Sequence, residues 1–503
     1  MKKILINDNP WQTRIAITEE SALQNIYFSA HVENPLERVF FKGTITKVLP
    51  GIQTAFVDIG QDKAGFLHIS EIDREMAIEK ISKTTQIDED DRPANRPTRQ
   101  TPIDISNILK EGDPILVQVS KEPVYEKGAK LTTCFTLPGR FIVLMPNIPR
   151  IGVSKKIDTP EERIRLKNIV KELLPEGMGA IIRTTCAERN MQEIAKDVKF
   201  LVSTWQELQK KFNTAQPKEK IYQDIELSLQ IVRDHLDDDV QEIITDSKEN
   251  QHRIYHFIKS IAPEYSHKVK LYDNNVPLFQ FYSIEKQIEE ALDKKVPLRS
   301  GGSLIIESTE AMSVVDVNTG KYIGKKSLED TILKTNLEAA EETVRQLRLR
   351  NIGGLIVIDF IDMTSHSNRQ KLFKFFEKTL RERDKFQSVV LKVSEFGLVQ
   401  MTRKRSGKTL VQQLTDYCPT CKGSGFIKSI ETETYTILRA LKIALKDRKP
   451  GDSVMLSINS DIFTYVSNIE YNSILKLEKE YGCTITLISE KSFPLSQYKI
   501  EKK

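Results

Sequence analysis

Apolar and polar residues alternate in short runs over the N-terminal part of the chain. The segments 3–6 and 13–18 alternate as the two strands of a β-hairpin do, and from residue 40 onwards short β-rich runs are separated by glycine-containing turns. Further strands are expected at 114–120 and 140–145. Between 84 and 101 the chain is charged, contains proline and lacks an apolar period, which predicts a mobile loop inserted between strands. The pattern indicates a small all-β module with one long insertion.

Strands alternate with helices in the remainder of the chain. Helices are expected at 161–174, 190–211, 328–350 and 372–383, and strands at 180–183, 303–307, 312–317 and 355–359. The third helix carries apolar residues at helical spacing, namely Leu333, Leu337, Ala340, Val344 and Leu347. The stretch 230–265 begins with the periodicity of a strand and then becomes helical. The alternation predicts an α/β layer domain from residue 303 and a small α/β unit after residue 431.

The composition is that of a soluble protein with more than one domain. A chain of 503 residues is too long for one hydrophobic core, so several domains are expected. The 75 basic and 70 acidic residues leave a net charge of only +5, so a nucleic acid would be bound by local patches and not by a global field. Three of the five cysteines are isolated, and no run approaches the roughly 18 apolar residues of a membrane span. We therefore expect a cytoplasmic protein without a transmembrane segment.

Two strand ends carry acidic side chains. Asp316 and Asn318 are two residues apart on an expected strand, so their side chains share one face, and Asp359 ends the apolar strand LIVID. Ligands in open α/β sheets gather at the carboxyl ends of strands, where two such acids can meet. Paired carboxylates suit Mg²⁺, which neutralises phosphate oxygens and activates water, and Asn318 could hold that water. The alternative is that the acids only cap the loops that follow, which is the commoner role of an isolated aspartate.

A close pair of cysteines, Cys418 and Cys421, is followed by a glycine-rich turn. A Cys-x-x-Cys pair supplies half of the four ligands that tetrahedral Zn²⁺ requires, and the sequence contains no second such pair or histidine pair to complete the site. Three interpretations stay open from the residues alone: a zinc ion shared between two copies of the chain, a plain loop, or a redox pair. The thioredoxin-like redox interpretation is the weakest, because no βαβ pattern is evident around the pair.

The expected α/β domain contains two long distinctive segments, SGGSLIIESTEAMSVVDVNTG at residues 300–320 and TNLEAAEETVRQLRLRNIGGLIVIDFIDM at residues 335–363. Together they resemble the catalytic core of the ribonuclease E/G family. The resemblance covers essentially the whole chain and, because no long C-terminal segment follows Lys503, it is closer to ribonuclease G than to full-length ribonuclease E. It implies an endoribonuclease in which Asp316 and Asp359 bind catalytic Mg²⁺ and Asn318 assists.

The resemblance also implies the reaction. We expect hydrolysis of single-stranded RNA to products with a 5′-phosphate and a 3′-hydroxyl, stimulated by a 5′-monophosphate on the substrate. The expected role is the processing of rRNA and tRNA and the decay of mRNA. Two alternatives compete with it: an S1-containing RNA-binding adaptor without nuclease activity, and a nuclease that acts on DNA. The acids and Asn318 favour a nuclease, and the all-β module favours RNA.

The all-β module resembles an S1 domain, an RNA-binding barrel of the oligonucleotide-binding class. In AFVDIG and GFLHI, Phe56 and Phe66 match the family's RNA-contacting positions, where aromatic rings stack on bases, and Lys127 offers a phosphate contact. Without the resemblance, a phenylalanine on a strand is more often a core residue.

A second set of residues resembles the family's 5′-phosphate sensor. Arg183 can bind a monophosphate through two donors, and Thr184 can donate its hydroxyl. Val143 matches a position that lines this pocket, and Lys155 and Lys156 match positions where some members carry arginine. Lysine keeps the charge there but lacks the planar fork of arginine. The alternative for a lone arginine is a solvated strand end.

The resemblance further implies a zinc link, in which Cys418 and Cys421 of two chains share one structural Zn²⁺. The implied assembly is a homodimer, or a tetramer built as a dimer of dimers. The implied fold class is multidomain α/β and α+β, with these parts: a structural RNase H-like domain at 1–37 plus 229–291, an S1 domain at 38–133 with the mobile insertion near 84–101, the 5′-sensor region at 134–228, a DNase I-like catalytic domain at 292–413, the zinc link at 414–427, and a small C-terminal α/β domain at 428–503.

Overall fold

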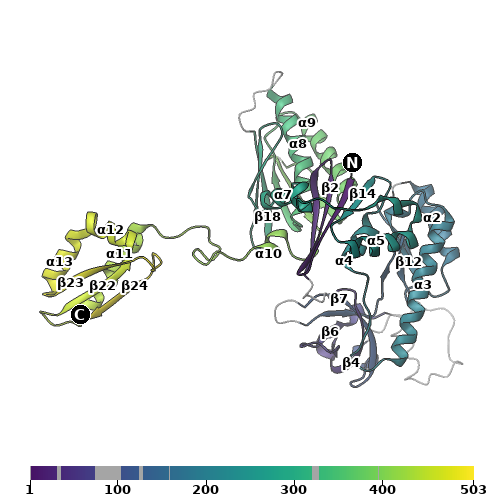
Figure 1. Cartoon of the computed structure of the whole chain (residues 1–503), viewed down its shortest axis with the longest axis horizontal. Helices are drawn as coiled ribbons and strands as arrows, with labels where there is room; N and C mark the ends of the chain where they lie inside the picture. Colours follow the sequence, from purple (N-terminus) through teal and green to yellow (C-terminus); the bar gives the residue numbers. More distant parts are fainter. Residues whose placement is uncertain are drawn as a thin grey trace, which may run out of the picture. The chain divides into compact units, whose positions relative to one another are not determined.

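The structure, a computed structural model, contains two compact units, Met1–Val411 and Gln412–Lys503 (Figure 1). It describes residues 2–30, 36–73, 104–123, 128–157, 159–319, 328–394 and 396–502. The predicted mobile insertion at 84–101 and the predicted RNA contact Lys127 lie outside the described residues. None of the helices in the described part of the chain is long and apolar enough to cross a membrane.

The first sheet joins the start of the chain to a segment more than 200 residues later. Its five strands run in the order β15-β14-β1-β2-β3. They are β1 (Lys2–Asn9), β2 (Gln12–Glu19), β3 (Ala22–Ala30), β14 (Val240–Thr245) and β15 (Val269–Leu271). The predicted hairpin is confirmed, because β1 pairs antiparallel with β2, and β1 also pairs parallel with β14. The accompanying helices are α4 (Leu227–His235), α5 (Lys248–Ile261), α6 (Leu278–Phe281) and α7 (Ile284–Glu290).

The strand expected at the beginning of 230–265 is wrong, because this segment belongs to helix α4. Its apolar residues Leu227 and Ile231 are one helical turn apart, Val232 follows directly, and Ile231 and Val232 are buried in the core of the first sheet. A short apolar run fits both periods, and here the packing against the sheet selected the helix. The strand of this stretch, β14, follows the helix.

The predicted all-β module is a closed barrel. Five strands in the order β4-β5-β6-β8-β7 form the barrel, which a pairing of β4 with β7 closes, and a sixth strand, β13, pairs with β4 outside this ring. They are β4 (Phe40–Leu49), β5 (Thr54–Asp58), β6 (Gly65–His68), β7 (Pro114–Lys121), β8 (Lys130–Thr132) and β13 (Lys220–Tyr222). Closure matters because it leaves few unpaired strand edges on a domain this small.

A small four-stranded sheet with two long helices follows the barrel. Its strands, in the order β11-β12-β10-β9, are β9 (Leu137–Pro138), β10 (Ile142–Met145), β11 (Ile151–Val153) and β12 (Gly179–Ile182). The helices are α2 (Pro160–Leu173) and α3 (Met191–Thr214), both of which the sequence predicts. Asn190 fixes the start of α3, because its side chain accepts from the Glu193 backbone while Glu193 caps Asn190 in return.

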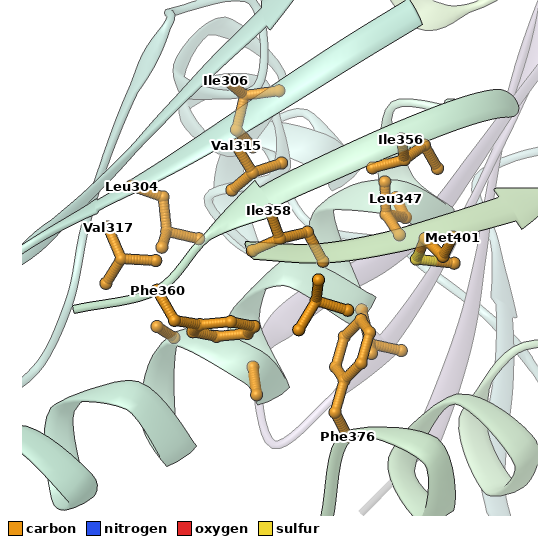
Figure 2. Close-up of a cluster of buried hydrophobic side chains, with 14 of the residues drawn as sticks. Leu304, Ile306, Val315, Val317, Leu347, Ile356, Ile358, Phe360, Phe376 and Met401 are labelled. Carbon is orange, nitrogen blue, oxygen red and sulfur yellow. The ribbon is translucent and has the colours of Figure 1, made fainter. Parts of the chain in front are cut away.

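The predicted α/β layer domain contains a six-stranded sheet in the order β16-β17-β18-β19-β21-β20. Its strands are β16 (Lys295–Pro297), β17 (Ser303–Ser308), β18 (Met312–Asn318), β19 (Gly354–Asp359), β20 (Ser388–Val390) and β21 (Leu398–Arg403). The helices are α8 (Leu328–Leu349), α9 (His366–Arg383) and the short α10 (Leu410–Leu414). Apolar side chains from five strands meet residues of α8 and α9 in one core, as Figure 2 shows for Val315, Ile358 and Phe376. The helices therefore cover one face of the sheet.

The C-terminal unit is a small α/β structure, in agreement with the sequence pattern. It contains β22 (Ser453–Asn459), β23 (Thr484–Glu490) and β24 (Tyr498–Lys502), with helices α11 (Ile430–Leu445), α12 (Ser460–Tyr465) and α13 (Tyr471–Tyr481). Because β22 and β23 pair parallel across two helices, the unit does contain a βαβ crossover, contrary to the sequence-based expectation. Cys418 and Cys421 nevertheless precede α11 and lie outside that crossover.

Candidate active site

Asp316 and Asp359 are direct neighbours on two adjacent strands. Strand β18 pairs parallel with β19, and the register places Asp316 opposite Asp359. Their strand neighbours Val315, Val317 and Ile358 point into the core beneath the helices, so the two carboxylates stand on the opposite face of the sheet. Both aspartates are exposed. The sheet thus brings together two acids that are 43 residues apart in the sequence.

Asn318 lies on the same face, one pleat further along β18. Its side-chain amide donates a hydrogen bond of 2.8 Å from Nδ2 to Oδ2 of Asp316. The bond fixes the orientation of the amide, whose oxygen remains an acceptor that faces the same open side. The three residues predicted from the strand patterns therefore form one constellation.

The loop that follows Asp359 is held by the helix behind it. Asn336, which is fully buried on α8, donates from Nδ2 to the carbonyl of Ile361 at 2.8 Å and accepts from the Ile361 amide at 3.0 Å. Glu329, near the start of α8, accepts hydrogen bonds from the backbone of Thr364 and Ser365. These contacts fix the chain on both sides of Asp362, so the loop beside the acids is rigidly anchored.

Electrostatic repulsion is concentrated at this end of the sheet. Partial burial raises the pKa of Asp359, and the negative charges of Asp316 and Asp362 raise it further. No lysine or arginine that the structure describes forms an ion pair with any of the three acids. In the described chain the carboxylates form a pair, not a cluster of three or more ligands. One or two carboxylates plus substrate phosphates is the usual way in which proteins bind Mg²⁺.

A hollow of about 470 Å³ lies beside Asn318 on the open face of the sheet. It is lined by Lys295, Pro297, Gly301, Gly302, Ser303, Ile305 and Asn318. Sequence reasoning missed this feature, because its residues come from three strands whose register no local pattern reveals. The doublet Gly301-Gly302 is the one signal that could have indicated it, since paired glycines often mark a close backbone approach.

The predicted 5′-sensor residues gather at one edge of the four-stranded sheet. Strands β11 and β12 run parallel, so Lys155 and Lys156, after β11, end near Arg183 and Thr184, after β12. Val143 lies on the neighbouring strand β10, opposite Ile181, and is half-buried. Thr184 and Lys155 are exposed. The fold therefore assembles the predicted set at one edge.

Two members of this set are already engaged by the protein. The Arg183 guanidinium donates from Nη1 to the Gly139 carbonyl at 2.7 Å and to Oδ1 of Asp234 at 2.8 Å. Burial opposes the charge on Asp234, but Arg183 and its basic neighbours hold the pKa of this carboxyl below its usual value. The ammonium of Lys156 donates to the Asp384 carbonyl, and burial lowers its pKa.

The two predicted aromatic residues of the barrel lie side by side. Phe56 on β5 is the cross-strand partner of Phe66 on β6, and both side chains are half-buried. Their neighbours Ala55, Val57 and Leu67 fill the interior of the barrel, whereas the two phenylalanines are not part of that core. The structure therefore disfavours the alternative in which these rings are core residues.

The cysteine pair is accessible and preorganised. Cys418 is exposed, and hydrogen bonds from the backbone N–H groups of Cys421 and Thr420 lower the pKa of its thiol. The Lys422 amide donates to the Cys418 carbonyl at 2.7 Å, which tightens the turn. Gly423 takes φ +91° there, a conformation that favours glycine. A lowered thiol pKa favours the thiolate that metal binding requires.

Comparisons with known proteins agree with this architecture. Family models match at three places: "Ribonuclease E/G family" at residues 136–406, "S1 RNA binding domain" at 39–133, and "RNase E/G, Thioredoxin-like domain" at 417–503. Ribonuclease G of Haemophilus influenzae is 37% identical over 499 residues, covering 99% of each chain. Ribonuclease G of Escherichia coli K12 is 35% identical over 499 residues, again covering 99% of each.

Ribonuclease E of Haemophilus influenzae is 34% identical over 504 residues, which cover 99% of this chain and 52% of that protein. These matches confirm the predicted resemblance to ribonuclease G, the predicted S1 domain and the predicted enzyme class, an endoribonuclease. The family model spans more than half of the chain, and relatives above 30% identity cover nearly all of it. The chain therefore belongs to the ribonuclease E/G family.

Proposed function

We propose that the protein is a Mg²⁺-dependent endoribonuclease that hydrolyses single-stranded RNA to 5′-phosphate and 3′-hydroxyl products at Asp316, Asn318 and Asp359. The observation that carries the proposal is the register that places Asp316 opposite Asp359 on the open face of the sheet. Asp316 and Asp359 suit Mg²⁺, because their carboxylates repel each other and no lysine or arginine that the structure describes is paired with either of them. Asp316 and Asp359 would hold the ion. When bound, it supplies charge neutralisation at the scissile phosphate and activation of water.

The chain's own groups orient this chemistry. Asp316 receives the amide N–H of Asn318, which leaves the amide oxygen of Asn318 free to accept a hydrogen bond from the attacking water. The anchored loop after Asp359 keeps its carboxylate in place, because Asn336 clamps the backbone at Ile361. Water is then the nucleophile, and the ribose 2′-hydroxyl takes no part, so the new ends are a 5′-phosphate and a 3′-hydroxyl.

Cleavage of matched oligonucleotides tests the proposal. RNA and DNA of the same sequence are incubated with the protein in Mg²⁺ and, separately, in excess chelator, and the product ends are identified by mass. We expect cleavage of RNA only, in Mg²⁺ only, with a 5′-phosphate on the downstream product. A 2′,3′-cyclic phosphate would show that the ribose attacks, and equal cleavage of DNA would show that the substrate class is wrong.

The proposed path of the RNA includes the barrel. The pair Phe56 and Phe66 presents two adjacent, half-exposed rings, and base–aromatic stacking contributes roughly 1–3 kcal/mol per base. Lys127 is proposed as the accompanying phosphate contact. Stacking tolerates any base, so this surface would hold single-stranded RNA without reading its sequence.

We propose further that Arg183, Thr184, Val143, Lys155 and Lys156 recognise a 5′-monophosphate. The edge that they form also contacts the catalytic sheet. Lys156 donates to the Asp384 carbonyl, and the Asp384 carboxylate forms a buried ion pair with Arg403 of β21 at 2.7 Å. Because β21 pairs with the strand that carries Asp359, an altered contact at the sensor edge can reach the acids.

Replacement of Arg183 tests end sensing. We expect Arg183→Ala to reduce the rate advantage of 5′-monophosphorylated over 5′-hydroxyl RNA by about tenfold, since a charge-assisted hydrogen bond contributes about 1.5–3 kcal/mol. Arg165→Ala, which removes a surface arginine paired with Glu162, is the matched control. Equal losses on both substrates would instead assign Arg183 a structural role through its bond to Asp234.

The assembly and domain assignments complete the proposal. Cys418 and Cys421 of two chains would share one structural Zn²⁺ in a homodimer or a dimer of dimers. We assign residues 1–37 and 229–291 to an RNase H-like domain, 292–413 to a DNase I-like catalytic domain and 414–427 to the zinc link. The discontinuous first sheet, in which β1 pairs with β14, supports the first of these assignments. The proposed role is rRNA and tRNA processing and mRNA decay in the cytoplasm.

A further inference from the structure

The open face of the catalytic sheet presents a second chemical group in line with the acids. Lys295 on β16 pairs with Ile305 on β17, Ile305 pairs with Asp316 on β18, and Asp316 pairs with Asp359 on β19. Cross-strand partners project from the same face of a sheet, so all four side chains stand on one row. The lysine is two strands from Asp316, roughly 10 Å between their backbones.

The hollow lies over the Lys295 end of this row and over the next row. The second row consists of Pro297, Ser303 and Asn318, which are cross-strand partners in the same three strands. All three line the hollow, and so do Lys295 and Ile305 of the first row. Asn318 therefore belongs both to the proposed catalytic constellation and to the wall of the hollow.

The turn between β16 and β17 ends in two glycines, Gly301 and Gly302, and both line the hollow. Gly301 takes φ +88°, and a Cβ atom on Gly302 would lie 2.5 Å from the Asn318 carbonyl oxygen. The turn is closed by a hydrogen bond of 2.9 Å from the Leu298 amide to the Gly302 carbonyl. A side chain at Gly302 would displace the backbone of Asn318, so glycine keeps both the hollow and the constellation intact.

Lys295 is free to bind a ligand. Its side chain is exposed, and it makes no ion pair with any residue that the structure describes. The adjacent Lys294, by contrast, is paired with Glu307 at 2.8 Å. A lysine ammonium on a flexible stem is a mobile point charge that suits a phosphate oxygen. The volume of about 470 Å³ lies within the range of small-molecule sites and accommodates one nucleotide.

We propose that this hollow is a subsite for the nucleotide next to the cleaved linkage, and that Lys295 binds the phosphate of that nucleotide. The inference rests on the proposed function, because it takes the row of Asp316 and Asp359 as the place of cleavage. Lys295 acts as a positioning residue. It holds the RNA strand across the sheet so that the neighbouring phosphate lies at the acids.

Neutral substrate linkages test the subsite. RNA oligonucleotides with one methylphosphonate, placed in turn at each linkage flanking the cleavage site, are cleaved by wild type, Lys295→Met and Lys294→Met. On unmodified RNA we expect Lys295→Met to raise KM about fivefold with little change in kcat, because the loss of one charged contact that water partly screens has an effect of about this size. The salt dependence of binding should become shallower by about 0.7 in log–log slope, the loss of one phosphate contact. Lys294→Met should match wild type.

One linkage should identify the contact. At that position the methylphosphonate should lower the cleavage rate of wild type as much as the Lys295→Met substitution does. The methylphosphonate and the substitution together should lower the rate no more than either does alone. The subsite would be overturned if the effects of the substitution and of the methylphosphonate on the cleavage rate multiplied at every linkage. It would also be overturned if Lys295→Met cleaved RNA with the same KM as Lys294→Met. If instead Asp316→Asn keeps full cleavage, the proposed catalytic site fails, and this result is independent of the Lys295 measurements.

Discussion

Asp316→Asn and Asp359→Asn should each lower the rate of RNA cleavage by at least about a hundredfold, because each removes a carboxylate charge that a metal site contributes to the transition state. The substitutions change little volume, and both side chains are exposed, so the fold and the binding of RNA should be nearly unchanged. Single-turnover cleavage in millimolar Mg²⁺, with RNA affinity measured in parallel, checks both statements.

Glu307→Gln is the matched control for these variants. Glu307 stands on the same face of the same sheet, one pleat beyond Ile305, and its loss removes one negative charge outside the row of acids. We expect this variant to cleave RNA at a rate close to that of wild type. Near wild-type rates in either aspartate variant, with the protein folded, would place the catalytic site elsewhere in the chain.

The double substitution Cys418→Ser with Cys421→Ser should abolish bound zinc and dissociate the assembly into single chains or smaller particles. One chain offers two thiols, and a closed structural zinc site has four ligands, so wild type should bind about one Zn²⁺ per two chains. Backbone donors already lower the pKa of Cys418, which favours its thiolate form. Light scattering and metal analysis of the same samples measure particle mass and zinc content.

Folding should survive the loss of the cysteines. The C-terminal unit has its own core, built from residues such as Leu441, Leu456 and Ile474, and neither cysteine belongs to it. Chelator or mild acid should dissociate wild type in the same way, since zinc binds thiolates only. Cys134→Ser, at an isolated half-buried cysteine, serves as the control. One zinc per chain, or an unchanged particle mass in the double variant, would assign the pair another role.

The sequence predicted those features that local patterns encode. Helix α8 follows from apolar residues at helical spacing, and the acids were found because Asp316 and Asn318 share a strand face and Asp359 ends an apolar strand. What no local pattern encodes is register. The pairing of Asp316 with Asp359 is set by strands separated by a whole helix, so the sequence indicated two acids but not that they are opposite each other.

The features that sequence reasoning missed depend on long-range contacts. Lys295 enters the row of acids only through two successive strand pairings. Lys156 was expected to contact a phosphate, but its ammonium donates to the backbone carbonyl of Asp384, which lies 228 residues later in the chain. Helix α4 was missed for a related reason, because its short apolar run fits two periods and only burial against the first sheet decides between them.

If the carboxylates of Asp316 and Asp359 hold the divalent ion that drives RNA cleavage, a change of one ligand should change the preference for the metal. The ratio of cleavage rates in Mn²⁺ and Mg²⁺, measured for wild type and for Asp359→Cys, tests this directly. A thiolate is a softer ligand than a carboxylate and binds Mg²⁺ poorly. We expect the Mn²⁺/Mg²⁺ ratio to rise at least about tenfold in Asp359→Cys, mainly because the rate in Mg²⁺ falls. An unchanged ratio, with cleavage in Mg²⁺ retained, would show that Asp359 does not bind the catalytic ion.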